Sequence, residues 1–332
     1  MIIQNIIKKV LVLFCIISFT GCSNEDNDTF NHEGIEGLTA DNFPMMDSST
    51  STNPLLKLMA YKLTGIKYKW ETSFMNGIEK YVVSDGDYYY SNATDIEKQK
   101  LAEIEAKLKC STTHGSFINL IDNQVELIIA SRNISRDEKL YAKEKGVDII
   151  EKPIGTDGFV FIKNKANPVK SLTCEQIKSI YSGKITNWKE VGGNDVPITP
   201  YMRNKNSGSQ EKMETLVMEG EPMLDLPELT GGGMTSPFFS LWEDVNGIAY
   251  TPYYYCTKMV DDPRIEMLRI NDIQPDKMTI ASHQYPYVSE IYVAMRADIT
   301  ENSMSWKIFE FLTSGKANDI IEESGYINAI SN

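Results

Sequence analysis

The sequence predicts an α/β fold of about two domains. Short runs rich in β-branched and aromatic residues alternate with helix-like segments along the 332 residues, which is typical of layered α/β proteins. At roughly 150 residues per domain, a chain of this length accommodates about two domains. The composition, with 42% hydrophobic and 24% charged residues, is that of a globular protein with enough apolar material for a core.

The first half of the chain carries clear helix and strand signals. Residues 51–65 (STNPLLKLMAYKLTG) place apolar residues at steps of three and four, with Pro54 suited to the first turn and Gly65 to the stop. Residues 95–109 (DIEKQKLAEIEAKLK) predict a second helix with charges at i,i+4 spacing. Residues 124–131 (QVELIIAS) predict a short strand.

The second half continues the same alternation. Residues 158–164 (GFVFIKN) predict a strand, and residues 171–183 (SLTCEQIKSIYSG) predict a helix that opens with a capping box at Thr173 and ends at its glycine. Residues 246–255 (NGIAYTPYYY) indicate a turn followed by a strand. Residues 303–315 (SMSWKIFEFLTSG) predict a late helix with a terminal glycine cap.

The first residues indicate export. Residues 1–21 combine Lys8 and Lys9 with an apolar run too short to span a bilayer, which predicts a signal peptide. The sequence FTGC resembles a bacterial lipobox, so Cys22 is the expected lipidation site; simple cleavage and release is the alternative. Residues 22–37 predict an acidic tether. We therefore expect a protein of the cell envelope, lipid-anchored in the periplasm or on the outer surface.

Charge, histidines and cysteines exclude several function classes. A formal charge of −13 argues against sequence-independent binding to nucleic acid. The three histidines are far apart in sequence and belong to no metal-ligand pattern, so neither metal nor cofactor is expected. Cys110, Cys174 and Cys256 form neither a disulfide framework nor a zinc motif; one pair could still form, but buried thiols are expected.

Residues 201–216 (YMRNKNSGSQEKMETL) have the features of an anion site. Arg203 stands four residues before Ser207, Gly208 and Ser209, where a helix is predicted to begin. A helix start leaves backbone N–H groups without partners and is partly positive, glycine permits close approach, and arginine adds a charged planar fork. The alternative is an ordinary serine cap beside a surface arginine.

Two further segments place hydroxyl groups before predicted helices. Residues 48–52 are five consecutive hydroxyl residues, where one would suffice as a cap. Residues 110–121 (CSTTHGSFINLI) repeat the arrangement with a glycine. If the three segments meet in one cleft, their donors could hold a small oxyanion at micromolar affinity, about −8 kcal/mol.

A resemblance to a known family supports this interpretation. Residues 167–195 (NPVKSLTCEQIKSIYSGKITNWKEVGGND), followed by the arginine and Ser-Gly-Ser of residues 201–216, closely resemble the phosphate-binding (PstS-like) subunit of bacterial phosphate ABC importers. DSSTSTNPL in the first ligand segment and MTSPFFSLWEDVNGIAYTPY near the end of the second lobe are similar to the same family. The resemblance covers about residues 40–330.

The resemblance implies a periplasmic-binding-protein type II fold: two lobes with central mixed sheets, joined by a two-strand hinge and closing around a ligand. Lobe 1 would comprise residues 38–160 and 288–332, and lobe 2 residues 161–287. The crossover strands would lie near residues 159–163 and 287–293. The implied ligand residues are Ser49, Thr50, Ser51, Thr112, Thr113, Ser116, Arg132, Arg203, Ser207, Gly208 and Ser209.

Arg132 departs from the family pattern. It aligns with an aspartate that, in well-studied phosphate binders, accepts a hydrogen bond from protonated phosphate and so rejects sulfate. Arginine has no acceptor, so Arg132 would raise general anion affinity and lose that discrimination. The alternative is that Arg132 turns outward. The ligand class expected from the sequence is therefore inorganic phosphate or a similar oxyanion.

The expected function is capture of this ligand and delivery to ABC permease subunits, by a monomer without catalytic activity. A phosphate or oxyanion sensor, or a surface binding module not coupled to transport, is the alternative. A hydrolase is not favoured because the serines near Arg203 lack a base or a metal motif.

Overall fold

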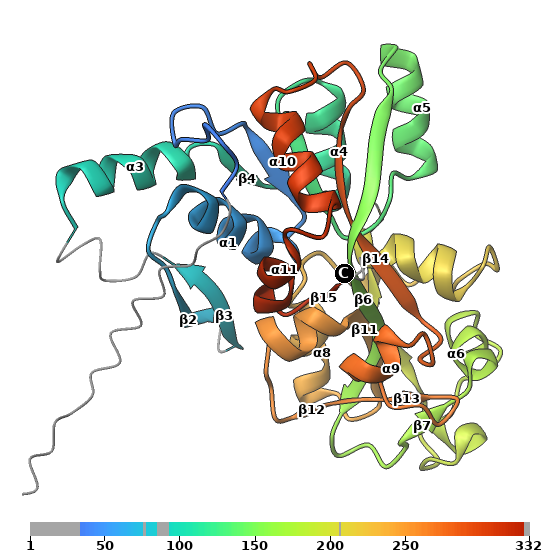
Figure 1. The fold of residues 1–332 in the computed structure, drawn as a ribbon. Helices are drawn as coiled ribbons and strands as arrows, with labels where there is room; N and C mark the ends of the chain where they lie inside the picture. Colours follow the sequence, from blue (N-terminus) through green and yellow to red (C-terminus); the bar gives the residue numbers. More distant parts are fainter. Residues whose placement is uncertain (1–33, 76–77, 85–92, 206, 329–332) are drawn as a thin grey trace, which may run out of the picture. The chain divides into compact units, whose positions relative to one another are not determined.

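A mixed sheet of nine strands forms the centre of the computed structural model, which describes residues 34–75, 78–84, 93–205 and 207–328 (Figure 1). The predicted leader 1–21, Cys22 and most of the tether 22–37 lie outside the described residues. The strand order is β4-β1-β5-β14-β6-β11-β8, and β12 and β15 also pair with β6. The strands of this sheet are β1 (Met46–Ser48), β4 (Leu108–Cys110), β5 (Leu127–Ala130), β6 (Ile149–Asn164), β8 (Thr199–Pro200), β11 (Gly247–Pro252), β12 (Ile265–Met267), β14 (Val288–Arg296) and β15 (Ile327–Asn328).

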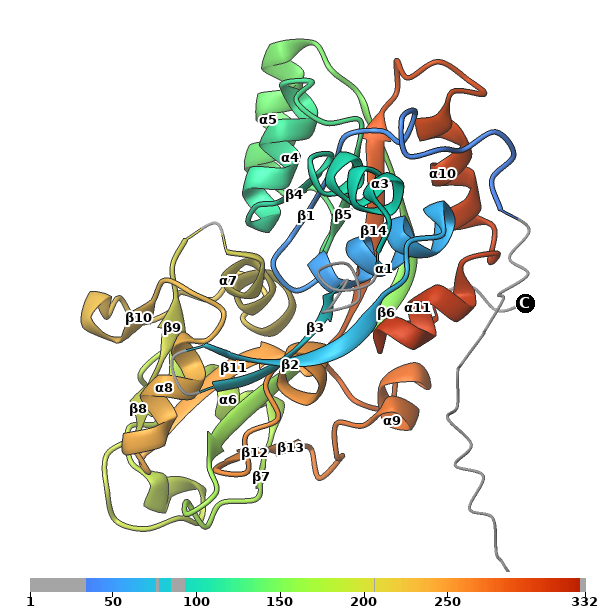
Figure 2. The ribbon, with the colours of Figure 1, turned by 90° about the vertical axis from the view of Figure 1, so that its left-hand side faces the viewer.

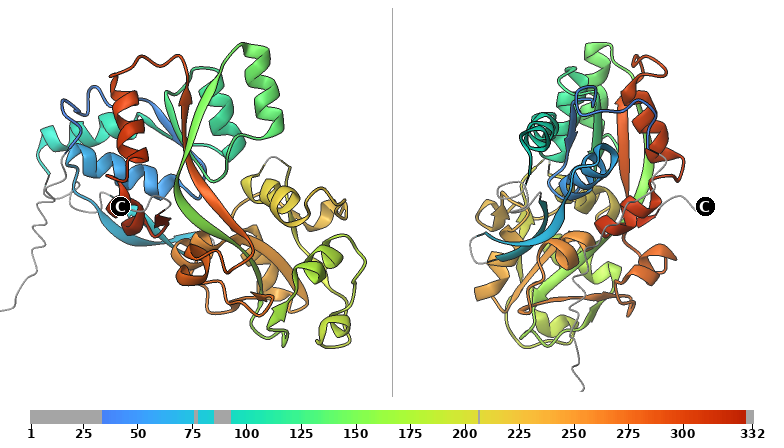
Figure 3. Two further views of the ribbon diagram at one scale, coloured as in Figure 1. Left: turned by 45° about the vertical axis from the view of Figure 1, so that its right-hand side comes forward. Right: turned by 60° about the vertical axis from the view of Figure 1, so that its left-hand side comes forward.

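Strand β6 belongs to both halves of this sheet. Its first part pairs antiparallel with β14, from Ile149 opposite Arg296 to Gly158 opposite Val288. From Phe159 onward it pairs instead with β11 and β12. The strands β1, β4 and β5 are parallel to one another, and β14 runs antiparallel to β5. The sheet is therefore mixed, and its two halves are the two lobes, which share β6. Figure 3 shows β6 and β14 running side by side between the two lobes.

Helices cover both halves of the sheet. Within the first half, α4 packs on β5 and α5, and α10 packs on β14; within the second, α8 packs on β11 (Figure 2). The helices are α1 (Asn53–Thr64), α3 (Asp95–Glu105), α4 (Thr113–Ile121), α5 (Arg136–Lys145), α6 (Cys174–Tyr181), α7 (Gly208–Lys212), α8 (Ser236–Glu243), α9 (Lys277–Ala281), α10 (Met304–Thr313) and α11 (Asn318–Ser324), with 3-10 or π turns at Trp188–Val191, Met213–Val217, Pro227–Leu229 and Tyr255–Met259. None of these helices is both long and apolar enough to cross a bilayer.

Three short ribbons complete the described part of the chain. The hairpin β2 (Lys69–Met75) and β3 (Ile78–Ser84) is antiparallel. The pairs β9 (Met202–Arg203) with β10 (Thr230–Gly231), and β7 (Ser171–Leu172) with β13 (Arg269–Ile270), are parallel. The β9–β10 ribbon fixes the backbone at Arg203, one of the predicted ligand residues.

The predicted α/β alternation is confirmed, with one difference in length. The helices predicted at 51–65, 95–109, 171–183 and 303–315 are present as α1, α3, α6 and α10, and the capping box at Thr173 is formed. The strand predicted at 158–164 is only the end of the 16-residue β6. The pattern does not reveal its first part, because Pro153 and two glycines interrupt the run of strand-forming residues.

An aromatic cluster lies where β6 and β11 pair. Phe159 and Phe161 on β6 lie with ring centroids 5.4 and 6.3 Å from Tyr250 on β11, and Tyr181 of α6 lies 5.5 Å from Tyr250. All four side chains are fully buried. Each such burial stabilises by about 1.5–3 kcal/mol, so the cluster holds α6, β6 and β11 in one fixed arrangement behind the site described next.

Candidate functional site

A small cavity lies where the three hydroxyl-bearing segments meet. Its volume is about 30 Å³, which is room for a few non-hydrogen atoms. The structure brings nine of the eleven predicted ligand residues to its walls, all except Ser116 and Arg132. The lining residues are Ser49, Thr50, Ser51, Thr112, Thr113, Ser131, Arg203, Ser207, Gly208, Ser209, Lys212, Met234 and Pro252.

The first segment is held in place by hydrogen bonds to the end of β5. The Thr52 hydroxyl donates to the Ile129 carbonyl at 2.6 Å, and the Ser49 hydroxyl lies 2.8 Å from that of Thr52 and 3.3 Å from that of Ser51. The phenol of Tyr326 donates to the Ser51 carbonyl at 2.9 Å. The serine hydroxyls are therefore fixed at the start of α1, whose first N–H groups have no intrahelical acceptor.

The second segment begins α4. The Thr112 hydroxyl accepts from the N–H of Gly115 at 3.1 Å and so caps the helix. The hydroxyl of Thr113, the first helical residue, lies 3.1 Å from that of Ser131 at the end of β5, and both side chains are buried. A second helix start and two hydroxyl groups thus face the cavity from the same half of the sheet.

The third segment supplies the positive charge. The Arg203 guanidinium donates from Nε to the Gly231 carbonyl at 3.2 Å and from Nη1 to the Met234 sulfur at 3.2 Å, and it forms no ion pair with a carboxylate within the described chain. Burial lowers the pKa of this guanidinium, but arginine remains charged in proteins. Ser207 caps α7 by accepting from the N–H of Gln210 at 3.1 Å.

Tyr250 positions this third segment. Its hydroxyl accepts a hydrogen bond from the Arg203 N–H at 3.1 Å and donates to the Gln210 side-chain carbonyl. Burial raises the pKa of this phenol, so it keeps its proton and can donate. The buried Tyr250 hydroxyl therefore links β9, which carries Arg203, to the first turn of α7.

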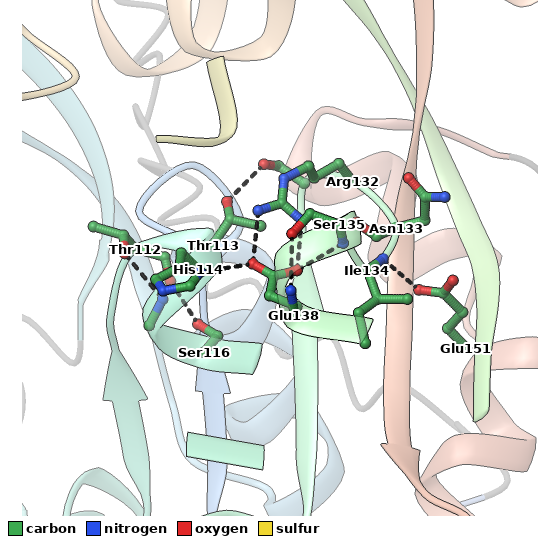
Figure 4. A network of polar contacts seen from close by, with 12 residues as sticks. Thr112, Thr113, His114, Ser116, Arg132, Asn133, Ile134, Ser135, Glu138 and Glu151 are labelled. Atoms are coloured by element: carbon green, nitrogen blue, oxygen red, sulfur yellow. Dashed lines mark hydrogen bonds and ion pairs between the residues drawn. The ribbon is translucent and has the colours of Figure 1, made fainter. Parts of the chain in front are cut away.

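Arg132 and Ser116 do not line this cavity. Arg132 forms a two-bond ion pair with Glu138, from Nη1 to Oε2 at 2.9 Å and from Nη2 to Oε1 at 2.8 Å (Figure 4). Glu138 closes the capping box of α5 and is fully buried, so it requires a cation nearby. Thr112 begins α4 earlier than the hydroxyl run suggested, and Ser116 therefore lies in the first turn, where its hydroxyl donates to the Thr112 carbonyl at 3.1 Å.

The environment of Glu138 shows how strongly it is paired with Arg132. Burial alone would raise the pKa of this carboxyl, but the hydrogen bonds and charge of Arg132, with the N–H of Ser135, outweigh it and hold the pKa below its usual value. The imidazole of His114 lies 3.1 Å from the same carboxylate. The charge of Arg132 is thus balanced within its own lobe.

Four lining residues were missed from the sequence: Ser131, Lys212, Met234 and Pro252. Two of them carried a usable signal. Lys212 is three residues after Ser209 and hence on the same helix face. Ser131 directly follows a predicted strand, although the resemblance to the family implies its neighbour Arg132 instead. Met234 and Pro252 reach the cavity through tertiary packing, which no local pattern indicates.

Nothing in the described part of the chain resembles a metal centre. No group of three or more histidine, cysteine, aspartate or glutamate side chains there could hold an ion. Cys174 and Cys256 are half-buried and are not joined by a disulfide, and Cys110 is exposed, so the expectation of buried thiols is not met. The cavity itself is lined by hydroxyls, backbone, two cations and two apolar residues.

Comparisons with known proteins agree with this architecture. Residues 89–299 match the family model of the PBP superfamily domain. The phosphate-binding protein PstS of Staphylococcus epidermidis strain ATCC 12228 is 27% identical over 226 residues, covering 65% of this chain and 67% of the relative. The protein of the same name from Staphylococcus aureus strain USA300 is 26% identical over 259 residues, covering 74% and 77%.

Solved structures show the same fold. A substrate-binding protein from Clostridium perfringens, crystallised with bound phosphate, superposes with a TM-score of 0.60 at 22% identity, covering 86% of this chain and 98% of that one. An ABC-type phosphate transport receptor from Vibrio cholerae gives 0.58 at 21% identity, covering 87% and 99%. The expected two-lobed binding-protein fold with a mixed sheet is confirmed.

Proposed function

This chain belongs to the PBP superfamily, and we propose that it captures inorganic phosphate, or a similar oxyanion, in the cavity between its two lobes and delivers it to an ABC permease. The ligand would be held by Ser49, Thr50, Ser51, Thr112, Thr113, Arg203, Ser207, Gly208 and Ser209. In this proposal lobe 1 comprises residues 38–160 and 288–332, lobe 2 comprises residues 161–287, and β6 and β14 form the hinge.

The observation that carries the proposal is the charge of the cavity wall. Arg203 is only 5% exposed and has no carboxylate partner in the described chain, and no acidic side chain lines the cavity. A buried cation without a counter-ion costs several kcal/mol unless a ligand supplies the negative charge. Helix starts at α1 and α4 add partial positive charge on the opposite wall.

The size of the cavity and its hydroxyl groups narrow the ligand class. A cavity of about 30 Å³ favours a small ion over a nucleotide or a sugar. Hydroxyls on all sides can each donate to an oxygen, as a tetrahedral oxyanion requires. The names of the Staphylococcus relatives and the phosphate bound to the Clostridium perfringens protein favour phosphate within that class.

Delivery to a permease and attachment to the envelope are further parts of the proposal. The Staphylococcus relatives are named as binding proteins and the Vibrio cholerae protein as an ABC-type transport receptor, which supports capture for import rather than catalysis. Export of the chain would follow from the leader 1–21, and lipidation of Cys22 would hold a monomer at the membrane near its permease.

Isothermal titration of the purified chain with phosphate, sulfate, arsenate and a phosphate monoester tests the proposal. We expect one site with a Kd at or below the micromolar range for phosphate, and no hydrolysis of the ester. Failure to bind any of the tetrahedral oxyanions, or turnover of the monoester at a rate abolished by Arg203→Ala, would refute it.

A further inference from the structure

A second buried cation, Lys212, lines the same cavity. It lies at the end of α7, three residues after Ser209, and its side chain is 3% exposed. Its ammonium group has no hydrogen-bond partner among the described residues. The buried Lys163 differs in this respect, because its ammonium group donates to the Asn167 carbonyl at 2.9 Å and to Glu266 at 2.6 Å.

The charged groups around Lys212 compensate its charge only in part. Asp157 on β6 is the acid that acts on it most, yet the two form no ion pair, and one Asp157 oxygen also lacks a hydrogen-bond partner. Arg132, after β5, repels it. Lys212 also lines a wider cavity of about 510 Å³, whose other titratable lining residues are Arg132, Arg136, Glu211, His283, Glu290 and Tyr292.

Lys212 therefore resembles Arg203 in the features that point to a ligand. Both side chains are buried, both line the small cavity, and neither is paired with a carboxylate there. They reach the cavity from one lobe, opposite the hydroxyls of Ser49 and Thr113. Two buried cations beside one space that no acidic residue lines are matched by a ligand with two negative charges.

We propose that Lys212 binds the oxyanion directly and that, together with Arg203, it makes the cavity select tetrahedral oxyanions by their double charge, so that sulfate binds about as well as hydrogen phosphate. This inference rests on the proposed function and extends it to ligand selection. The cavity would not discriminate between phosphate and sulfate, because no carboxylate lines its wall to accept a proton from phosphate. The second ligand-binding cation would be Lys212, not Arg132 as expected from the sequence.

The ionisation of Lys212 supplies a signature that a merely structural lysine would lack. Burial lowers the pKa of Lys212 to about 8, and Asp157 only partly offsets this. A bound anion favours the charged amine, so affinity is greatest below about pH 8 and falls as the pH rises through that value. Asp157, with a pKa raised by burial to about 6, has finished titrating by then, and Arg203 stays charged.

The test is calorimetric titration of the purified chain with sulfate and with phosphate between pH 7.5 and 9.5, in buffers of different ionisation enthalpy. Sulfate has no proton to exchange in this range, so any proton uptake on binding belongs to the protein. We expect the wild type to bind sulfate within tenfold of phosphate, to take up protons near pH 8.5, and to lose affinity as the pH rises.

Lys212→Met should bind both anions at least tenfold more weakly, without proton uptake and without the fall above pH 8. Lys212→Arg should restore most of the affinity with no such fall. Lys205→Met, which removes an exposed lysine from the same segment, is the matched control and should change neither property. The melting temperature of each ligand-free variant is measured alongside, which separates lost binding from lost folding.

The outcomes distinguish the inference from the proposed function. If the wild type binds neither anion, the proposed function itself fails. If it binds phosphate but not sulfate, selection by charge is wrong. If Lys212→Met keeps the wild-type affinity or proton uptake, Lys212 is not a ligand, although phosphate capture would stand.

Discussion

Gly208 of the second lobe lies against Thr113 of the first so closely that no side chain fits between them. A Cβ atom placed on Gly208 would lie 2.6 Å from the Thr113 hydroxyl and 2.8 Å from that of Ser131. Distances below 3.0 Å require one of the groups to move. The first residue of α7 and the first residue of α4 therefore meet across the cavity, and this contact sets how near the two lobes can approach.

Substitution Gly208→Ala should weaken phosphate binding by at least tenfold, about 1.4 kcal/mol. The methyl group would hold α7 away from α4, so hydroxyls on opposite walls could not contact one small ion together. Calorimetry measures the loss, and the melting temperature of the ligand-free chain should change little.

The matched control for this change is Gly232→Ala. A Cβ atom on Gly232 meets nothing within 4 Å, so affinity should remain at the wild-type value. If Gly208→Ala binds phosphate as tightly as the control does, the close approach of the lobes has no part in binding.

Arg203→Ala should reduce phosphate affinity by tenfold or more while the chain stays folded. The substitution removes a charged donor that faces the anion, and a hydrogen bond to a charged group is worth about 1.5–3 kcal/mol. Arg269→Ala, at an exposed arginine of the same lobe, removes the same charge and should leave the affinity within twofold. Equal losses of affinity in the two variants would indicate that the net charge of the lobe, and not contact with Arg203, determines phosphate binding.

Tyr250→Phe should act on binding through position alone. The phenol touches no ligand atom in our account, but it joins the Arg203 N–H to Gln210, and each lost bond costs about 1 kcal/mol. We expect a three- to tenfold weaker Kd for phosphate by calorimetry. Tyr254→Phe removes a buried hydroxyl without a hydrogen-bond partner in the described chain, and it should bind normally. An unchanged Kd for Tyr250→Phe would remove Tyr250 from the account.

Arg132→Ala should damage stability more than binding. It leaves the Glu138 carboxylate buried without its partner, which costs about 3–5 kcal/mol in the free energy of unfolding at pH 7. Because the pKa of Glu138 lies below its usual value of 4.5 in the folded chain, this stabilisation is present above about pH 4.5 and is lost as the pH falls through the lower folded value. The difference in the free energy of unfolding between wild type and variant should therefore become small at acidic pH.

Urea unfolding at pH 7 and at pH 3.5 measures this difference. Lys189→Ala, which breaks an exposed ion pair with Asp195, should cost less than about 1 kcal/mol at either pH. Phosphate affinity of Arg132→Ala should stay within threefold of the wild type. A loss of affinity as large as that of Arg203→Ala would return Arg132 to the ligand set.

Local patterns predicted most of the fold because its helices begin and end with strong signals. The capping box at Thr173 and the left-handed Gly65 each mark a boundary that the structure keeps. Strand β6 was predicted only in part, since its length depends on pairing with β14 rather than on its own residues.

The candidate site was predictable to the extent that hydroxyls, glycine and arginine lie in short segments before helices. The wrong predictions concern which of two adjacent residues faces the cavity. Arg132 and Ser131 are adjacent, and the ion pair with the buried Glu138 turns the arginine toward α5. Lys212 was overlooked because a lysine in a helix is usually a solvated residue, and its burial is a product of tertiary packing.

A crystal of the chain grown with arsenate, with diffraction recorded at the arsenic absorption edge, tests the central claim most directly. Our account predicts one strong anomalous peak inside the cavity, within hydrogen-bonding range of Arg203, Lys212 and the hydroxyls of Ser49, Thr113 and Ser207. A peak placed instead in the wider space beside Arg136 and His283, with the small cavity unchanged, would contradict it.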